Sequence, residues 1–553
     1  MTYSRRQAIG VLATGLATAG LSGRPGFGQT IATQPAQGRR GRAGARGAGP
    51  DFPPLAPAPA IPGGPFKGTR ESLQASYKIP DWYRDAKFGM WAHWGPQSAA
   101  EYDDWYARRM YIPGEPQYEY HLKNHGHPSK VGFKDIIFGW KAEKFDAEYL
   151  VNLYKKAGAK FFCSMGVHHD NFDLWNSKHH PKWNAVATGP RKDIVTMFRE
   201  ATRKAGLRFA VSEHLSNSFS WFAPSHLSDP TGPMAGVPYD GADPQWADLY
   251  HDYSQVPGGA QAFAGGATSM GRVNYQPWVT NYYQRMIDLI DQHQPDLLYT
   301  DGGIQYGDYG LNQLAHLYNL SARRNGGVAD AVYTSKSRPD AALGICVLDR
   351  ERSVESTISP TPWQTDTCIG NWHYHKRIYE EDRYKTPKWV IDMLVDIVAC
   401  NGNLMLNIPL PANGMPDDKE MKVIEGITAW MTVNSEGIYG TRPYKIAGDG
   451  PALPPATNPT RFAESTRGEL TAQHVRFTTK GDALYAFVMG WPGREATIPA
   501  LGTAASQGVG RIQSVELLGV GKVPFTQNEA GLKVTLPEKP PSDYAIAFKI
   551  MGA

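Results

Sequence analysis

From about residue 87 to residue 410, short apolar runs alternate with segments in which apolar residues recur at helical spacing. A short apolar run is typical of a buried strand, and recurrence every three to four residues is typical of an amphipathic helix. The predicted strands are residues 87–94, 160–167, 207–214, 296–301, 344–349 and 403–410. This alternation predicts an α/β fold with a parallel sheet, and the size of the region favours a closed (β/α)8-type (TIM-like) barrel over an open sheet.

Helix ends can be placed in the same region. Asp146 precedes one helical segment as a predicted N-cap, and Gly158 is the predicted stop. Pro277 opens a second helix, while Thr386 and Pro387 form a cap and first turn of a third. No Gly-rich nucleotide-binding motif follows a predicted strand, which further favours the barrel.

The C-terminal part has a different pattern, because the helical period disappears after residue 445. Apolar runs there alternate with turn residues, which predicts a small antiparallel β-sandwich over residues 446–553, after a barrel over residues 66–445. Structural support of the barrel is the favoured role of the sandwich, and sugar binding is the alternative. Residues 222–276 are rich in Gly, Pro and aromatic residues and predict an extended loop over one end of the barrel.

The N-terminus carries most of the positive charge. Residues 1–29 contain the pair Arg5 and Arg6 before a short, weakly apolar segment, which resembles a twin-arginine export signal and predicts a periplasmic or secreted protein. A flexible basic tail is the alternative. Residues 30–65 are crowded with Gly, Pro and Ala and predict a linker.

Charge and cysteine content exclude several classes of function. The chain has a net charge of +4, but residues 1–50 hold seven arginines and no acidic residue, so the remainder carries −3. A nucleic-acid-binding body is therefore not indicated. No apolar run is long enough to span a membrane. The four cysteines form no CxxC pair, which argues against a zinc ribbon and predicts small core residues.

Polar residues close four of the predicted strands. They are His93 in the first, His168 and His169 after the second, Glu213 and His214 in the third, and Asp301 in the fourth. Because the active site of such a barrel lies at the carboxyl ends of its strands, we expect these residues to share a pocket. Ordinary solvation of strand ends is the alternative for each one taken singly.

The two adjacent histidines do not have the spacing of a metal site. Neighbouring strand residues point to opposite faces, so His168 and His169 reach a common ion only if the strand breaks between them. Imidazoles can instead exchange hydrogen bonds with hydroxyl groups, and nearby tryptophans offer apolar faces to a sugar ring. The sequence therefore predicts a carbohydrate pocket with neither a metal nor a cofactor. The tryptophans are Trp91, Trp94, Trp105, Trp175 and Trp221.

Six segments between about residues 70 and 445 resemble, in order, the motifs of the α-L-fucosidases of glycoside hydrolase family 29. They are "KFGMWAHWG", "EYDDWYARRMY", "GVHHDNFDLWNSKHHPKWNAVATGPRKDIV", "QPDLLYTDGG", "PWQTDTCIGNWHY" and "GNLMLNIPLPANG" with "VNSEGIYGTRPY". The resemblance implies a barrel followed by a β-sandwich. It also implies a retaining exo-glycosidase that removes terminal fucose from glycans or glycoconjugates through a covalent fucosyl-enzyme.

The resemblance also implies the catalytic residues. Asp301, which closes the "PDLLYTDG" type of motif, corresponds to the family's nucleophile. The acid/base lies in a divergent loop, where Glu351 matches the spacing best and Glu355 is second. Arg350 and Arg352 flank Glu351 and would lower its pKa if they paired with it, which is the opposite of what a general acid needs.

By the same resemblance, His93, His168 and His169 bind fucose hydroxyls, and Trp105 and Trp372 pack against the ring and its C5 methyl.

The chain departs from the family's pattern at three places, which affect the substrate subsite. Asp104 stands where family members have a glutamate before the Trp-Tyr pair, and Asn171 stands in place of the glycine of "HHDGF". Glu213 and His214 stand at a strand end that is tyrosine-rich in many members, so they bring another titratable pair to the predicted pocket.

Two other classes of function compete with a fucosidase. One is a metal-dependent barrel hydrolase, which a chelator would inactivate. The other is a non-catalytic carbohydrate-binding protein on a glycosidase scaffold, which turnover would exclude. Linkage preference and oligomeric state do not follow from the sequence.

Overall fold

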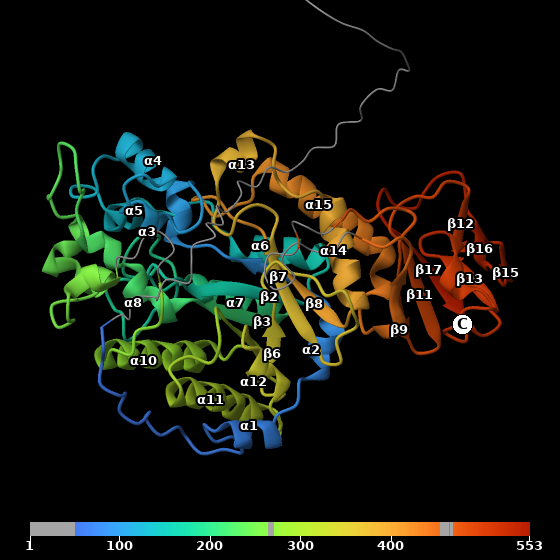
Figure 1. Ribbon diagram of the computed structural model, residues 1–553, viewed down its shortest axis with the longest axis horizontal. Helices are drawn as coiled ribbons and strands as arrows, with labels where there is room; N and C mark the ends of the chain where they lie inside the picture. Colours follow the sequence, from blue (N-terminus) through green and yellow to red (C-terminus); the bar gives the residue numbers. More distant parts are fainter. Residues whose placement is uncertain (1–49, 264–269, 454–463, 465–467) are drawn as a thin grey trace, which may run out of the picture. The chain divides into compact units, whose positions relative to one another are not determined.

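The computed structural model describes residues 50–263, 270–453, 464 and 468–553, which form a closed parallel barrel followed by two antiparallel sheets (Figure 1). The barrel strands are β1 (Phe88–Ala92), β2 (Phe161–Val167), β3 (Arg208–Glu213), β4 (Leu297–Thr300), β5 (Val332–Ser335), β6 (Val347–Asp349), β7 (Trp363–Cys368) and β8 (Gly402–Asn407). Each pairs in parallel with the next, and β1 closes onto β8. The predicted barrel is therefore confirmed.

Two of the eight strands were not among the predicted runs. β5 has only four residues, and β7 has no continuous apolar run because it carries buried polar side chains. Those polar groups are paired inside the barrel: Gln364 donates to Asp349 at 2.8 Å, and the Tyr299 hydroxyl donates to Asp366 at 2.8 Å. The interior of this barrel is thus partly polar beneath its carboxyl-terminal end.

The helices are α1 (Arg70–Ser76), α2 (Asp81–Ala86), α3 (Tyr106–Arg109), α4 (Pro116–Asn124), α5 (Phe133–Gly139), α6 (Ala147–Lys156), α7 (Ile194–Lys204), α8 (Ser218–Trp221), α9 (Ala247–Tyr250), α10 (Gln276–His293), α11 (Asp308–Arg324), α12 (Arg338–Ala342), α13 (Lys376–Glu380), α14 (Pro387–Ala399) and α15 (Asp418–Asn434). The predicted caps are confirmed. The Asp146 side chain accepts from the Tyr149 amide at 2.9 Å, and the Thr386 hydroxyl accepts from the Trp389 amide at 3.2 Å. Gly158 ends α6 with φ +105°.

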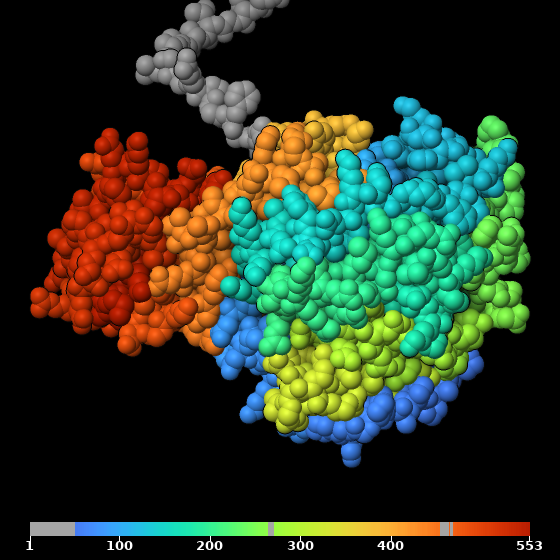
Figure 2. Space-filling view, turned by 180° about the vertical axis from the view of Figure 1, so that it is seen from behind, coloured from blue at the N-terminus to red at the C-terminus, as the bar shows by residue number. Residues whose placement is uncertain are grey.

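Residues 50–77 run along the outside of α10 and α11. Asn319 of α11 exchanges two side-chain hydrogen bonds with the Phe66 backbone, and Tyr77 stacks on Tyr318 with ring centroids 4.1 Å apart. Figure 2 shows this segment as a blue band beneath the yellow-green surface. The described end of the predicted linker, residues 50–65, also lies against the barrel, because the Ala56 amide donates to Gln276 of α10 at 2.7 Å and Asn312 of α11 donates to the Pro59 carbonyl at 2.9 Å.

The C-terminal strands form the predicted antiparallel arrangement. A six-stranded sheet has the order β14-β13-β17-β11-β10-β9, and a three-stranded sheet has the order β12-β16-β15. The strands are β9 (Arg442–Asp449), β10 (Val475–Lys480), β11 (Ala483–Val488), β12 (Glu495–Ile498), β13 (Ser514–Leu517), β14 (Gly521–Lys522), β15 (Phe525–Asn528), β16 (Gly531–Thr535) and β17 (Ile546–Met551). Trp430 of α15 donates to the Ala545 carbonyl at 2.7 Å, which ties the sheets to the barrel helices.

Three further predictions concern the core and the surface. All four cysteines are free thiols and buried, as predicted. In the part of residues 222–276 that the structure describes, short helices such as α9 interrupt the predicted loop. Across the described residues, no helix combines the length and apolar character that crossing a membrane requires. The predicted export signal, residues 1–29, lies outside them.

Candidate active site

Five residues from four strand ends meet above the barrel. The His93 ring, after β1, lies 5.1 Å from the His168 ring, after β2, and 4.9 Å from the His214 ring, after β3, measured between centroids. His169 and His214 each place a ring nitrogen 3.5 Å from Oδ2 of Asp301, which follows β4. The expected shared pocket is thus present in the structure.

Asp301 is the centre of this group. Its amide donates to the Glu213 carbonyl at 3.0 Å, which continues the pairing of β3 with β4. Burial raises the pKa of the Asp301 carboxyl, but the charge of Lys336 and hydrogen bonds from His169 and His214 hold it well below its ordinary value. The Lys336 charge and the two histidines therefore favour the ionised form of Asp301.

A lysine that follows β5 joins Asp301 to Glu351. The Lys336 ammonium lies 2.8 Å from Oδ1 of Asp301 and 2.7 Å from Oε2 of Glu351. Two atoms bound to one nitrogen are separated by no more than the sum of these distances, so these carboxylate oxygens lie within about 5.5 Å of each other. This upper limit is compatible with the spacing of about 5–5.5 Å between the carboxyl groups of retaining glycosidases, and lies below the roughly 6.5–9.5 Å of inverting ones.

The arginines beside Glu351 pair with other residues. The amides of Arg350 and Arg352 donate to carbonyls of β7, so the backbone on either side of Glu351 stays bonded to that strand. Arg350 forms an ion pair with Glu355, and Arg352 forms one with Glu464 at 2.6 Å. Lys336 forms an ion pair with Glu351, and Arg350 forms one with Glu355.

His168 and His169 point to different partners. β2 ends at Val167, so neither histidine is held to the alternation of a strand. The Gln97 amide donates to Nδ1 of His168 at 2.8 Å, which leaves the proton of the neutral ring on Nε2. His169 faces Asp301 instead. The two histidines therefore line different sides of one pocket.

Burial keeps two of the imidazoles uncharged. Desolvation and the neighbouring histidines hold the pKa of His93 and of His168 well below the ordinary value. Both ring nitrogens of His93 are buried without a hydrogen-bond partner among the described residues. Neutral rings with open donor and acceptor positions are suited to hydroxyl groups.

Two tryptophans border the pocket. Trp372 lies with its ring 5.3 Å from His93, nearly parallel to it, and Trp105 lies 6.1 Å from His169, edge to face. Trp105 has a positive φ of +59°, as do two other non-glycine residues close by, Glu101 and Asp103. Such strained backbone is concentrated at binding and active sites.

Glu213 and Asn171 turn away from the pocket. The Glu213 carboxylate is fully buried, accepts from the Tyr282 hydroxyl at 3.1 Å and from the Leu215 amide at 3.0 Å, and burial raises its pKa to about 7. Asn171 has φ +59°, a conformation that asparagine tolerates better than most residues, and its side chain accepts from Arg285 at 2.6 Å. The asparagine thus replaces a glycine at a backbone position and not in the pocket.

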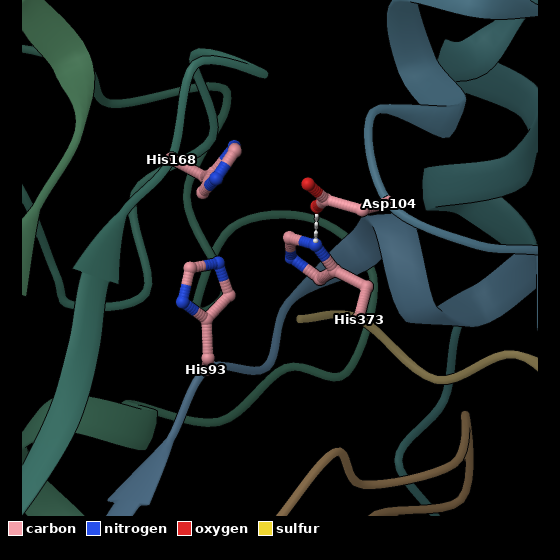
Figure 3. A group of neighbouring side chains, drawn as sticks. All are labelled: His93, Asp104, His168 and His373. Atoms are coloured by element: carbon pink, nitrogen blue, oxygen red, sulfur yellow. Dashed lines mark hydrogen bonds and ion pairs between the residues drawn. The ribbon is translucent and has the colours of Figure 1, made fainter. Parts of the chain in front are cut away.

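His373 and Asp104 complete the pocket around His93 and His168. Nδ1 of His373 lies 2.6 Å from Oδ1 of Asp104, and Figure 3 shows this pair facing the other two rings. Each of the four residues offers one polar atom, and these atoms lie within 4.8 Å of one another.

The spacing of these four atoms suits a hydroxyl oxygen better than a zinc ion. A zinc ion about 2.1 Å from every ligand requires ligand atoms within about 4.2 Å of each other. A hydroxyl oxygen, bound at about 2.8 Å, accommodates groups up to about 5.6 Å apart. The observed limit of 4.8 Å falls between these two values.

The sequence did not indicate Lys336 or His373. Lys336 follows a strand that was not predicted, so its place at a strand end was hidden. His373 directly follows Trp372, inside a recognised motif, and its neighbour in the pocket, Asp104, was predicted. A polar residue beside a predicted pocket residue was the available signal.

Two family models match the chain. The model described as alpha-L-fucosidase matches residues 58–436, and the model described as alpha-L-fucosidase C-terminal domain matches residues 468–551. Together they cover the barrel and the antiparallel strands other than β9.

Curated relatives and solved structures agree with these models. The chain is 24% identical over 488 residues to the tissue alpha-L-fucosidase of Macaca fascicularis, covering 86% of this chain and 90% of that one. It is 28% identical over 403 residues to the human plasma alpha-L-fucosidase, covering 71% and 75%. The Thermotoga maritima alpha-fucosidase, solved also with fucose and with a mechanism-based inhibitor, has the same fold, with a TM-score of 0.65 at 22% identity over 88% of this chain; coverage of the Thermotoga chain is 99% or more.

Proposed function

The chain belongs to the α-L-fucosidase family and is a glycoside hydrolase, and we propose that it removes terminal α-L-fucosyl groups from glycans or glycoconjugates with retention of configuration. Asp301 is the proposed nucleophile and Glu351 the proposed acid/base. The observation that carries this proposal is the Lys336 bridge, which keeps the two carboxylate oxygens within about 5.5 Å of each other.

The first step forms a fucosyl-enzyme. The Asp301 carboxylate attacks the anomeric carbon, the bond to the leaving oxygen breaks, and protonated Glu351 transfers its proton to that oxygen. In the second step, water attacks the same carbon, Glu351 takes the proton of the water, and Asp301 is released.

Lys336 balances the charge during this exchange. Before the first step its ammonium faces ionised Asp301, and afterwards Asp301 is a neutral ester while Glu351 has become a carboxylate. The same ammonium contacts both groups, so it stabilises whichever of them is charged. No large movement is needed to follow the charge.

Sugar binding is assigned to the imidazoles and the aromatic rings. His93 and His168 are neutral and bind fucose hydroxyls, and His169 binds beside Asp301. Trp105 and Trp372 supply apolar faces to the ring and its methyl group.

The stereochemical course of an aryl α-L-fucoside tests the proposal. Proton NMR should show α-L-fucose as the first product, before mutarotation, and a 2-deoxy-2-fluoro-fucosyl inhibitor should label a peptide containing Asp301. Initial formation of β-L-fucose would refute retention. Loss of activity after dialysis with a chelator, restored by zinc, would favour the metal-dependent hydrolase instead.

Export is a separate proposal, supported by Arg5 and Arg6 before a short apolar segment. Expressed in a bacterium with a twin-arginine pathway, the full chain should reach the periplasm and lose its N-terminus. Replacing both arginines with lysine should retain the protein in the cytoplasm. Equal export of the two versions would contradict the proposal.

A further inference from the structure

The pair formed by His373 and Asp104 has no part in the catalytic steps above. The two residues come from distant segments, one before α3 and one after β7, and their side chains meet at 2.6 Å. The His373 side chain is completely buried, while Asp104 keeps 22% of its side chain exposed. A buried ring held against a partly exposed carboxylate lies at the wall of the pocket.

The contact fixes the hydrogen-bonding pattern of the ring. An ionised carboxylate only accepts hydrogen bonds, so Nδ1 of His373 carries a proton and donates a hydrogen bond to Asp104. In the neutral ring, Nε2 is then an acceptor. Nε2 is buried and has no hydrogen-bond partner among the described residues. A buried acceptor without a partner is unfavourable, so this nitrogen is suited to a ligand that donates.

The surroundings of His373 point to the sugar as that ligand. The His373 ring lies 4.7 Å from the His93 ring and 4.9 Å from the His168 ring, and both nitrogens of His93 are also without partners among the described residues. Figure 3 shows the three rings around a common space. Groups that each lack a partner therefore converge on the position of one or two hydroxyl oxygens.

We propose that His373 is a specificity-determining residue, whose Nε2 accepts a hydrogen bond from one hydroxyl of the bound fucosyl group while Asp104 holds its tautomer and orientation. This inference rests on the proposed function and adds a substrate contact to it. Asp104 is one methylene shorter than the glutamate of the family's pattern, and the imidazole extends from its carboxylate into the pocket. The His373 ring thus contacts the sugar, and Asp104 acts on the sugar only through that ring.

Monodeoxy substrates test the contact directly. The kcat/KM of an aryl α-L-fucoside and of its 2-, 3- and 4-deoxy analogues is measured for the wild type and for His373→Phe. In the wild type, the analogue that lacks the hydroxyl bound by His373 should react at least about 100-fold more slowly, because a buried acceptor is left unpaired. In the variant, the penalty for that analogue should fall to a fewfold, while the other two penalties persist.

The ratio of kcat/KM for two substrates does not depend on how much of the variant is folded. Comparing this ratio between the variant and the wild type cancels the intrinsic reactivity of each analogue. Asp104→Asn should weaken the same penalty without abolishing it. His375→Phe is the matched control, because His375 lies two residues away and 4.0 Å from Asp103. It should leave all three penalties unchanged.

Three unchanged penalties in His373→Phe would overturn the inference. A parent fucoside that the wild type does not turn over would overturn the proposed function, and the inference with it. If the wild type turns over the parent fucoside and His373→Phe changes none of the three penalties, the inference fails while the proposed function stands.

Discussion

The two carboxyl groups of the site are held in different ways. Asp301 directly follows β4, its amide is bonded to the neighbouring strand, and two histidines and Lys336 surround its carboxylate. Glu351 lies in the segment between β6 and β7, whose arginines are tied to Glu355 and Glu464. The proposed nucleophile is thus positioned by the barrel, and the proposed acid/base by the ion pairs of its flanking arginines with Glu355 and Glu464.

This difference has a chemical meaning. A nucleophile must be aimed at one carbon atom and gains from a rigid strand end, whereas the acid/base donates to the leaving group and then accepts from water in its place. If the comparison holds, changes on the Asp301 side should abolish the reaction, and changes around Glu351 should depend on the leaving group.

The largest effect is expected for Asp301→Gly. Its kcat/KM for an aryl α-L-fucoside should fall by about 10⁴-fold or more, because no group can form the covalent intermediate. Azide should restore part of the activity and give β-L-fucosyl azide, detected by NMR. Asp308→Asn, at an exposed carboxylate seven residues on, is the control and should react like the wild type. Full activity of the glycine variant would remove Asp301 from the mechanism.

The second-largest effect is expected at Glu351, the proposed acid/base. Glu351→Gln should lower kcat/KM by about 10²–10⁴-fold for substrates with poor leaving groups, since these need a proton donor. For a strongly acidic phenol as leaving group the loss should be small. Azide should accelerate release in this variant and give α-L-fucosyl azide.

Glu355→Gln is the matched control for this prediction. Glu355 is engaged by Arg350, so its variant should show the same dependence on the leaving group as the wild type. A strong dependence in Glu355→Gln, without one in Glu351→Gln, would exchange the two assignments.

The same contrast explains which residues the sequence could predict. Asp301 closes an apolar strand and a recognisable motif, and both are local features. Glu351 was placed by spacing alone, and the sequence left open whether its flanking arginines pair with it. In the structure their partners include Glu464, a residue 112 positions away from Arg352. Such partners follow from the fold and not from the local pattern.

Lys336 and His373 were missed for related physical reasons. Lys336 follows β5, whose four residues are too few to give a clear apolar pattern. The place of His373 in the pocket depends on its contact with Asp104, which lies 269 positions earlier in the chain, so no local pattern indicates it. The helix caps at Asp146 and Thr386 could be predicted, because a cap is formed by residues within one turn.

Lys336→Met should sharpen the comparison through the pH profile. Burial raises the pKa of Asp301 and the charge of Lys336 lowers it, so removing this charge raises the pKa. In the proposed mechanism, activity needs ionised Asp301 and is lost as the pH falls through its pKa, so the acidic limb of kcat/KM should move to higher pH. Lys336→Arg keeps the charge and should keep the limb near its original place. Overlapping profiles of Lys336→Met and the wild type would show that Lys336 does not set this ionisation.

The smallest effect is expected for Glu464→Gln. Glu464 has 1% of its side chain exposed and pairs with Arg352 and with Lys385 at 2.6 and 2.7 Å, so it holds the segment next to Glu351 in place. Loosening that segment should lower kcat/KM by about tenfold for poor leaving groups, because misplacement by a fraction of an ångström costs part of the acid's contribution. With a strongly acidic leaving group the change should be within about twofold, since that reaction needs little proton donation. Glu469→Gln, at a side chain that is 78% exposed, should change neither rate. Equal losses with both leaving groups would mean that Glu464 supports the fold generally and that the acid/base is not positioned by this ion pair.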